Sequence, residues 1–350
     1  MHMADALISP LVGGTMWAAT AGVAAYSIKK VQNEIDEKKI PLMGVMGAFI
    51  FAAQMINFSI PATGSSGHLG GGLILAILLG PYAGFLTMAS VLTIQALFFG
   101  DGGLLALGSN VFNLGFFTCF IAYPLIYKRI IGKGYSSKRI FGAAMLTAII
   151  GLQMGSFSVV LETLFSGKTE LPFGTFVLLM QPIHLAIGVV EGLVTTAIVT
   201  FVWKERPEII EKAASGDAIG GVSIKKVLAG VAIAAVISGV VLSGFASSSP
   251  DGLEWSMFKT AGKAALKAPD GIHQMLSAIQ HKTVFLPHYN FKAPEVNLNQ
   301  NVIVGEAAWP AVSGGKSVAG LVGGGMTLAL AAFVGLCISL FKRRKKRIIA

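Results

Sequence analysis

The sequence predicts an all-α, polytopic transmembrane helical bundle of about nine helices. Three observations lead to this fold class. Hydrophobic residues make up 54% of the 350 residues and charged residues only 13%, whereas soluble domains carry about 25% charged residues. The mean hydropathy is +0.71. Apolar runs recur along the chain, many near the length of about 20 residues that a helix needs to span a bilayer. The lipid bilayer is therefore the chain's predicted surroundings.

The apolar runs lie at roughly 10–28, 41–58, 69–80, 82–99, 104–127, 139–165, 174–203, 226–245 and 319–341. The third run is short and glycine-rich, and only Gly80 and Pro81 separate it from the fourth. Because proline cannot continue the hydrogen bonding of a helix, these two runs form either a tight hairpin of helices or one kinked helix.

The basic residues decide the topology. They cluster at 29–39, 128–139, 204–226 and 342–347. Counting the third and fourth runs as two crossings places all four clusters on one face, and Lys and Arg concentrate on the cytoplasmic face of membrane proteins. We therefore expect nine crossings, with the amino terminus outside and the carboxyl terminus in the cytoplasm. The loop at roughly 59–68 then lies on the same outer face as the amino terminus.

Composition divides the chain into four parts. Residues 1–205 form a membrane domain, and residues 206–225 a charged cytoplasmic linker. Residues 226–341 form a unit of two transmembrane helices that flank an extracytoplasmic segment, 246–318, and residues 342–350 a basic cytoplasmic tail. The outer segment has too little periodic apolar content for a large core.

Several function classes are disfavoured. The net charge of +10 is explained by the positive-inside pattern, so no nucleic-acid partner is expected. Cys119 and Cys337 lie inside apolar runs without metal-type spacing. The segment Gly314–Ser317 resembles the end of a phosphate-binding loop, but Pro310 stands where that motif needs glycine and no strand is predicted before it. We expect no ATP site on this chain and no enzymatic activity.

The amino terminus can chelate a metal ion. The α-amine of Met1, the backbone amide of His2 and the Nδ1 atom of its imidazole can close two fused chelate rings. A planar set of nitrogen donors suits Ni(II) or Cu(II), and one further histidine would complete it. His68 lies in a glycine-rich loop on the same predicted face. Because the start of the chain lacks the basic and short apolar regions of a cleavable signal, we expect Met1 to be retained.

Other polar residues are weaker candidates. His184 and Glu191 are seven residues apart on one face of a predicted membrane helix. Ionisable groups at that depth are functional candidates, although a pair that only packs helices together is an equal alternative. Glu162, Gln95, Asn110 and Asn113 are candidates for orienting the metal-binding histidines. The remaining histidines, His273, His281 and His288, are expected to be solvated, with a second metal-binding patch as the alternative.

Small residues recur at helical spacing in the first and last predicted helices. Ala18, Ala21, Gly22 and Ala25 lie in the first, and Gly320 and Gly324 in the last. Such spacing permits close approach of helices, either within the bundle or with a partner subunit.

Three segments carry a family resemblance. The opening Met-His-Met-Ala-Asp-Ala-Leu-Ile-Ser-Pro, the segment 66–71 with His68, and Leu79-Gly80-Pro81 resemble the CbiM/NikM family. These proteins are substrate-binding (S) components of energy-coupling-factor (ECF) transporters for cobalt and nickel. The similarity covers roughly residues 1–205. The segment from about 220, with Pro-Asp-Gly-Leu-Glu-Trp at 250–255, is similar to the small accessory component of the same systems.

The resemblance implies a seven-helix S-component core fused to a two-helix accessory unit. It implies Ni²⁺ or Co²⁺ as transported substrate, held by Met1, His2 and His68. The ATPase subunits and the transmembrane coupling (T) subunit would be separate chains, and this chain would lie in the cell (inner) membrane of a prokaryote. The alternative function is a proton-coupled secondary transporter of divalent metal ions that uses His184 and Glu191.

Overall fold

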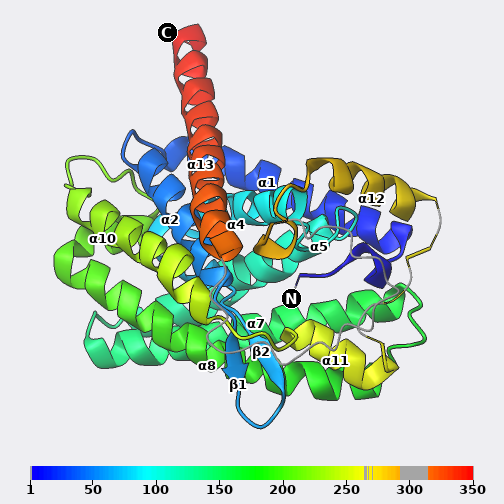
Figure 1. Ribbon diagram of the computed structural model, residues 1–350. Helices are drawn as coiled ribbons and strands as arrows, with labels where there is room; N and C mark the ends of the chain where they lie inside the picture. Colours follow the sequence, from blue (N-terminus) through cyan, green and yellow to red (C-terminus); the bar gives the residue numbers. More distant parts are fainter. Residues whose placement is uncertain (1, 264–265, 267, 270, 292–313, 350) are drawn as a thin grey trace.

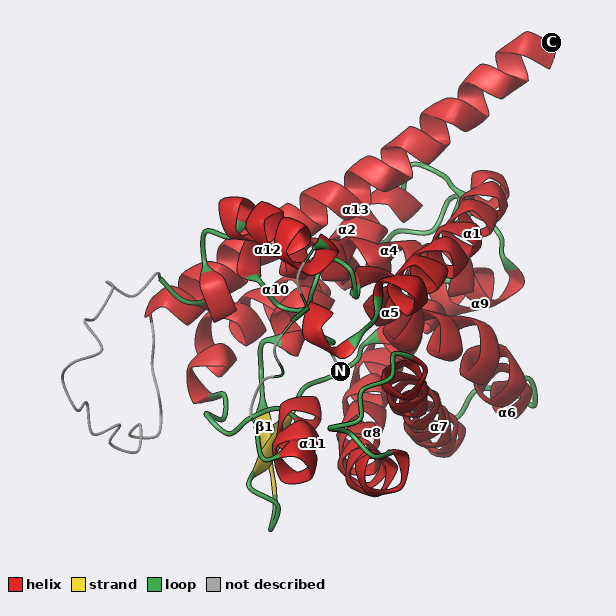
Figure 2. Ribbon diagram, turned by 90° about the vertical axis from the view of Figure 1, so that its right-hand side faces the viewer, coloured by secondary structure: helices red, strands yellow, loops and turns green. Residues whose placement is uncertain are grey.

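Helices dominate the structure, a computed structural model that describes residues 2–263, 266, 268–269, 271–291 and 314–349 (Figure 1). Seven helices in this described part are long and apolar enough to cross a membrane. The one sheet found there is a two-stranded hairpin (Figure 2). The predicted all-α polytopic bundle is confirmed.

The first half of the chain contains η1 (Asp5–Leu7), α1 (Pro10–Glu34), α2 (Lys39–Gln54), strands β1 (Phe58–Ile60) and β2 (Ser65–Gly67), α3 (Gly72–Leu79), and α4 (Pro81–Ile94), which η2 (Gln95–Phe99) continues. One continuous helix follows, made of α5 (Leu107–Val111), η3 (Phe112–Tyr127) and α6 (Lys128–Ile131). After it come α7 (Ser137–Phe165), α8 (Phe173–Glu205) and α9 (Pro207–Ser215). The last part contains α10 (Lys225–Val236) with η4 (Ile237–Val241) and η5 (Leu242–Phe245), then α11 (Gly252–Ala261), α12 (Ile272–Thr283), η6 (Pro287–Tyr289) and α13 (Gly314–Ile349).

The third and fourth apolar runs form a hairpin of two helices, α3 and α4. Gly80 between them has a φ of 83°, a conformation that glycine adopts without steric cost, and Pro81 starts α4. The prediction of a spanning helix at 69–80 is wrong in one respect. With eight residues, α3 is about 12 Å long and is too short to cross a bilayer alone.

The basic clusters meet at one end of the bundle, which we call the basic end. The Nζ atom of Lys128 donates to the carbonyl of Ala214 at 2.8 Å and thereby joins the second cluster to the linker. Arg343 at the end of α13 pairs with Glu37 at 2.8 Å, beside the first cluster. The Nζ atom of Lys38 in the first cluster donates to the carbonyl of Val222 in the linker at 2.7 Å, so the described residues bring parts of all four predicted clusters together.

The opposite end holds the hairpin of strands β1 and β2, the start of the chain and the described part of residues 246–318, which we call the accessory segment. Ser9 caps α1 by accepting from the amide of Val12, and its own amide donates to Ser166 Oγ at 2.9 Å. The amide of Ser66 in β2 donates to the carbonyl of Pro250 at 2.8 Å. The loop before His68 and the amino-terminal segment thus lie at the same end, as predicted.

The linker is more ordered than its charged composition indicates. Residues 207–215 form α9, an amphipathic helix that buries Ile209, Ile210 and Ala213 against the basic end of the bundle. The carbonyl of Ala213 lies against Gly80, so α9 covers the turn between α3 and α4.

The two predicted small-residue faces differ in their packing. In α13, Gly320 contacts the backbone of Gly239 in η4, and Gly324 lies near Ala48 of α2. α13 and α10 therefore both pack along α2, and the end of α13 projects beyond the other helices (Figures 1 and 2). In contrast, Ala18, Ala21, Gly22 and Ala25 of α1 are exposed.

Candidate metal centre

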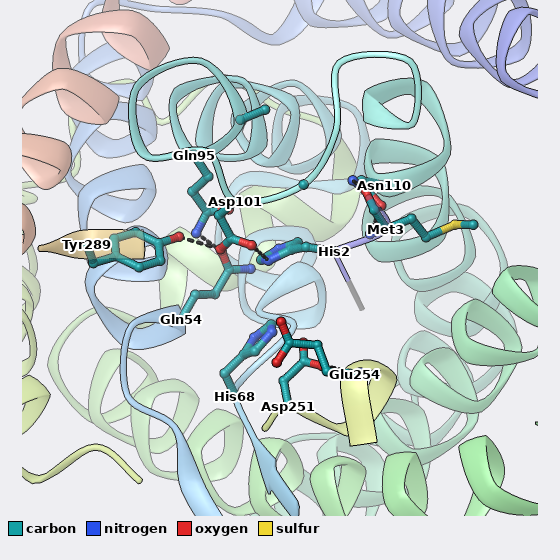
Figure 3. Close-up of polar contacts among 12 residues, drawn as sticks. His2, Met3, Gln54, His68, Gln95, Asp101, Asn110, Asp251, Glu254 and Tyr289 are labelled. Atoms are coloured by element: carbon teal, nitrogen blue, oxygen red, sulfur yellow. Dashed lines mark hydrogen bonds and ion pairs between the residues drawn. The ribbon is translucent and has the colours of Figure 1, made fainter. Parts of the chain in front are cut away.

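The amino-terminal segment is clamped inside the bundle. The amide of Met3 donates to Asn110 Oδ1 at 2.8 Å, and the Nδ2 atom of Asn110 donates to the carbonyl of Met3 at 3.2 Å. The amide of Gly103 donates to the same carbonyl at 2.9 Å. Because main-chain atoms make these bonds, the position of His2 is fixed by the backbone beside it (Figure 3). Met1 lies outside the described residues.

The two predicted histidines are in ring contact. The imidazoles of His2 and His68 are stacked, with centroids 5.0 Å apart and planes inclined by 21°. His68 is buried, and its Nδ1 atom donates to the carbonyl of Leu69 at 3.0 Å. That bond places the proton on Nδ1 and leaves the lone pair on Nε2, the usual arrangement in a metal-binding histidine.

Asp101 is the nearest acidic partner of this pair, and the sequence analysis did not single it out. Its Oδ1 atom lies 2.9 Å from His2 Nδ1, and its Oδ2 atom accepts a hydrogen bond from the hydroxyl of Tyr289. Asp101 occurs in the glycine-rich stretch 100–103 between two membrane helices, and this isolated charge was a usable signal. Tyr289, from the accessory segment, had no such signal.

Two glutamines support the loop that carries His68. Gln95 Nε2 donates to Gln54 Oε1 at 2.8 Å, and Gln54 Nε2 donates to the carbonyl of Gly70 at 2.8 Å. Of the predicted orienting residues, Gln95 and Asn110 therefore lie at the site. Asn113 and Glu162 instead bond to each other at 3.2 Å.

The accessory segment covers the site. Asp251 forms a bridge with Ser66 of β2, and its carboxylate caps α11 by accepting from the amide of Glu254 at 2.8 Å. Asp251 and Glu254 both point toward His68 (Figure 3). Together with Asp101 and the two histidines they line a polar cleft of about 270 Å³.

Burial and neighbouring charges set the protonation of the site. Burial lowers the pKa of His68 to about 4. Burial alone would raise the pKa of Asp101, but the charge and hydrogen bond of His2 outweigh it and hold that pKa below its usual range. The pKa of Asp251 is also lowered despite burial, with His68 among the causes. Near neutral pH the cleft thus offers a neutral imidazole at His68 and two ionised carboxylates.

The predicted chelate and the structure differ at one atom. The fused rings need Nδ1 of His2, and that nitrogen contacts Asp101. In the described part of the chain no three His, Cys, Asp or Glu side chains form a group suited to a metal ion. The predicted chelate would require His2 to exchange Asp101 for the ion.

His184 and Glu191 lie directly beneath this site and bond to backbone rather than to each other. Nδ1 of His184 donates to the carbonyl of Met180 at 2.8 Å. The carboxylate of Glu191 accepts from the amides of Gly70 and Gly71 at 2.7 and 3.1 Å, at the start of α3. A negative group is favourable at a helix amino terminus, so Glu191 ties the His68 loop to α8.

Of the other three histidines, His288 lines the outer cleft. His281 and His288 are exposed, as expected. The expectation of a solvated side chain is wrong for His273, which is buried and has its Nε2 atom 2.9 Å from the carbonyl of Ile8. Its contact holds α12 against the amino-terminal segment.

Comparison with known proteins gives two family matches. Residues 2–209 match the model of a cobalt uptake substrate-specific transmembrane region, and residues 225–340 match the PDGLE domain. A metal transport protein of Haloquadratum walsbyi is 37% identical over 210 residues, which are 60% of this chain and 93% of that protein. A fused nickel transport protein of Rhodobacter capsulatus is 30% identical, over 60% of this chain and 64% of that protein.

One cobalt transport protein and one solved structure extend the comparison. The cobalt transport protein of Geobacter sulfurreducens is 29% identical, over 63% of this chain and 64% of that protein. The crystal structure of a truncated transition metal transporter superposes with a TM-score of 0.52 at 30% identity. It covers 59% of this chain and 99% of that one.

Proposed function

The chain belongs to the family of cobalt uptake substrate-specific transmembrane regions, and on that premise we propose that it is the substrate-capture component of an ATP-driven ECF importer for Ni²⁺ or Co²⁺. It is a multi-pass membrane protein and a metal-transport component rather than an enzyme, as the sequence predicted. The relatives named for nickel and for cobalt support a divalent transition metal as cargo.

The proposed ligands are the amine of Met1, the amide nitrogen and imidazole of His2, and His68. The observation that carries this assignment is the ring contact between His2 and His68, because the two residues come from distant parts of the chain and meet in an acidic cleft. A set of nitrogen donors favours Ni²⁺ and its neighbours, whereas Mg²⁺ and Ca²⁺ prefer oxygen ligands.

Binding exchanges one contact of His2 for another. The ion takes Nδ1 of His2 from Asp101, while the hydroxyl of Tyr289 keeps its hydrogen bond to that carboxylate. Asp101 then remains beside the cation and balances part of its charge. The accessory segment, through Tyr289, Asp251 and Glu254, forms the outer wall of the cleft, which supports a role in ion capture.

In the proposed orientation the cleft faces the outside of the cell and the basic end faces the cytoplasm, because Lys and Arg prefer the cytoplasmic face. The ATPase and T subunits are proposed as separate chains. The exposed small-residue face of α1 is the proposed contact for the T subunit, since small residues allow helices to approach closely.

Reconstitution tests the proposal. The purified chain in liposomes should bind ⁶³Ni²⁺ but accumulate none inside, with or without a pH gradient. Accumulation should require ATPase and T subunits together with ATP. If the chain alone accumulates the ion when a pH gradient is imposed, the secondary-transporter alternative with His184 and Glu191 replaces this one.

A further inference from the structure

A second, smaller cavity lies next to the metal centre, toward α8. Its lining includes His68, His184 and Asp251 with the glycines Gly67 and Gly252, and its volume of about 10 Å³ suffices for about one water-sized particle. His68 lines both this cavity and the outer cleft. Asp251 also lines both, and each cavity contains a further histidine: His184 in this one and His2 in the outer cleft.

His184 presents a free nitrogen to this cavity. Its side chain is 1% exposed, and the bond from Nδ1 to Met180 places the proton on the side of the ring that faces the backbone of α8. Nε2 lies on the other side, is buried, and has no hydrogen-bond partner among the described residues. Because leaving a buried acceptor unpaired is unfavourable, packing alone does not explain this arrangement.

Two glycines allow the backbone around this cavity to approach α8 closely. A Cβ atom at Gly67 would overlap Ile187, and one at Gly252 would overlap Ile183 and lie 3.5 Å from Cε1 of His184. Any side chain at these positions would push the β1–β2 hairpin and α11 away from α8. The backbone of both segments therefore approaches His184 as closely as their glycines allow.

Glu191 holds the loop that carries His68 against α8. Its bonds to the amides of Gly70 and Gly71 hold the residues after His68 against the same face of α8 that carries His184. The lone pair of His68 is on Nε2, as is that of His184. Two neutral imidazoles with available Nε2 atoms, next to the carboxylate of Asp251, are donors that suit divalent nickel, cobalt, copper or zinc.

We propose that the imidazoles of His68 and His184 form a second and inner binding station for the transported divalent transition-metal ion. His68 has one lone pair, so it serves the two stations in turn: the ion exchanges His2 for His184 while it stays bound to His68. The inner station is the weaker one, since it lacks the fused chelate rings, and weak binding is what an ion needs in order to leave again. The cargo, but not the existence of the inner station, rests on the proposed function.

Counting imidazoles on bound Cu²⁺ tests the station, because pulsed EPR detects the remote nitrogen of each coordinated ring. The full chain carrying His2→Ala, which cannot form the outer chelate, is loaded with one equivalent of Cu²⁺. We expect two imidazoles on the ion, and one fewer after His184→Gln is added. Glutamine keeps most of the volume and polarity of the site, and His184→Ala serves as a second variant. Thr195→Ala, at another buried position of α8 whose hydroxyl has no hydrogen-bond partner among the described residues, should leave the count at two.

An imidazole count that His184→Gln and His184→Ala both leave unchanged would overturn the proposal, and so would a His2→Ala chain that retains no Cu²⁺. Failure of the proposed function would appear elsewhere, as a wild-type chain that does not bind Ni²⁺ tightly. In cells that take up ⁶³Ni²⁺ through this chain, His184→Gln should lower uptake at least tenfold and Thr195→Ala should not.

Discussion

The imidazole of His2 stacks on that of His68, with 5.0 Å between the ring centroids. This relationship joins the amino terminus to the loop before α3 and places both rings in the acidic cleft beneath the accessory segment. Since Asp101 holds Nδ1 of His2, the pair is arranged so that a metal ion competes with a carboxylate for one nitrogen.

Inserting one alanine between Met1 and His2 should abolish tight Ni²⁺ binding. The insertion separates the terminal amine from the amide and imidazole of His2, so the fused rings cannot close. Isothermal titration calorimetry should show at least a hundredfold loss of affinity. Met3→Leu, a volume-conserving change at a buried position, should keep wild-type affinity. If the insertion variant binds as tightly as the wild type, the chelate is not the binding mode.

His68→Ala should lower Ni²⁺ affinity at least tenfold, because it removes the fourth nitrogen donor. His281→Ala, an exposed histidine of α12, is the matched control and should bind normally. In cells, His68→Ala should also take up less ⁶³Ni²⁺ than His281→Ala. Wild-type uptake by His68→Ala would remove this residue from the site.

Asp101→Asn should weaken Ni²⁺ binding at least tenfold, although it removes a competitor for His2. A carboxylate and a divalent cation ~5 Å apart attract by about 7 kcal/mol at an effective dielectric constant of about 20. The hydrogen bond that the ion replaces is worth only about 1.5–3 kcal/mol. Tyr289→Phe keeps the charge of Asp101 and should change the affinity less than threefold. Tighter binding by Asp101→Asn would show that competition outweighs attraction.

Metal affinity should fall by at least tenfold per pH unit between pH 7 and pH 5, because coordination of the His2 amide requires loss of its proton. His68 should contribute nothing to this loss. Its folded-state pKa of about 4 lies below the ordinary value of 6.5, so it stays neutral throughout that window and gains a proton only in stronger acid. Competition titrations with a chelator, from pH 5 to pH 8, measure the slope. A step near pH 6.5 that His68→Ala abolishes would contradict the assignment.

The same lowered pKa affects stability. Because the unfolded chain binds a proton at His68 more readily than the folded chain does, folding becomes less favourable as the pH falls below about 6.5, and the loss continues to about pH 4. Thermal unfolding in detergent should show that His68→Ala loses less stability than the wild type between pH 6.5 and pH 4.

Sequence reasoning located the long helices well and the short elements poorly. The run at 174–203 became α8, Phe173–Glu205, because a long apolar stretch has few alternatives to a spanning helix. The eight residues of α3 were predicted only as part of a longer run. Their boundaries depend on Gly71, which has a φ of 80°, and on Glu191, which binds the backbone before the helix. Such tertiary contacts leave no periodic signal.

In the candidate site, too, some features could be predicted from the sequence and others depend on tertiary contacts. Charge placed the His68 loop and His2 on one face, and the structure places them together. Gln54 and Tyr289 were missed because their roles come from contacts with Gly70 and with Asp101, neither of which is near them in sequence. The spacing of His184 and Glu191 correctly predicted a shared helix face, but not that each bonds to backbone.

The exposed face of α1 provides the last prediction. Ala21→Trp should reduce cellular uptake of ⁶³Ni²⁺ at least fivefold, because a large side chain on the small-residue face prevents close approach of the proposed T-subunit helix. It should leave Ni²⁺ affinity unchanged, since Ala21 is exposed on the outside of the bundle and does not line the cleft. Leu193→Trp, on an exposed position of α8, is the matched control and should affect neither quantity. Normal uptake by Ala21→Trp would place the coupling surface on another helix, and loss of metal affinity would show that the substitution disturbs the bundle itself.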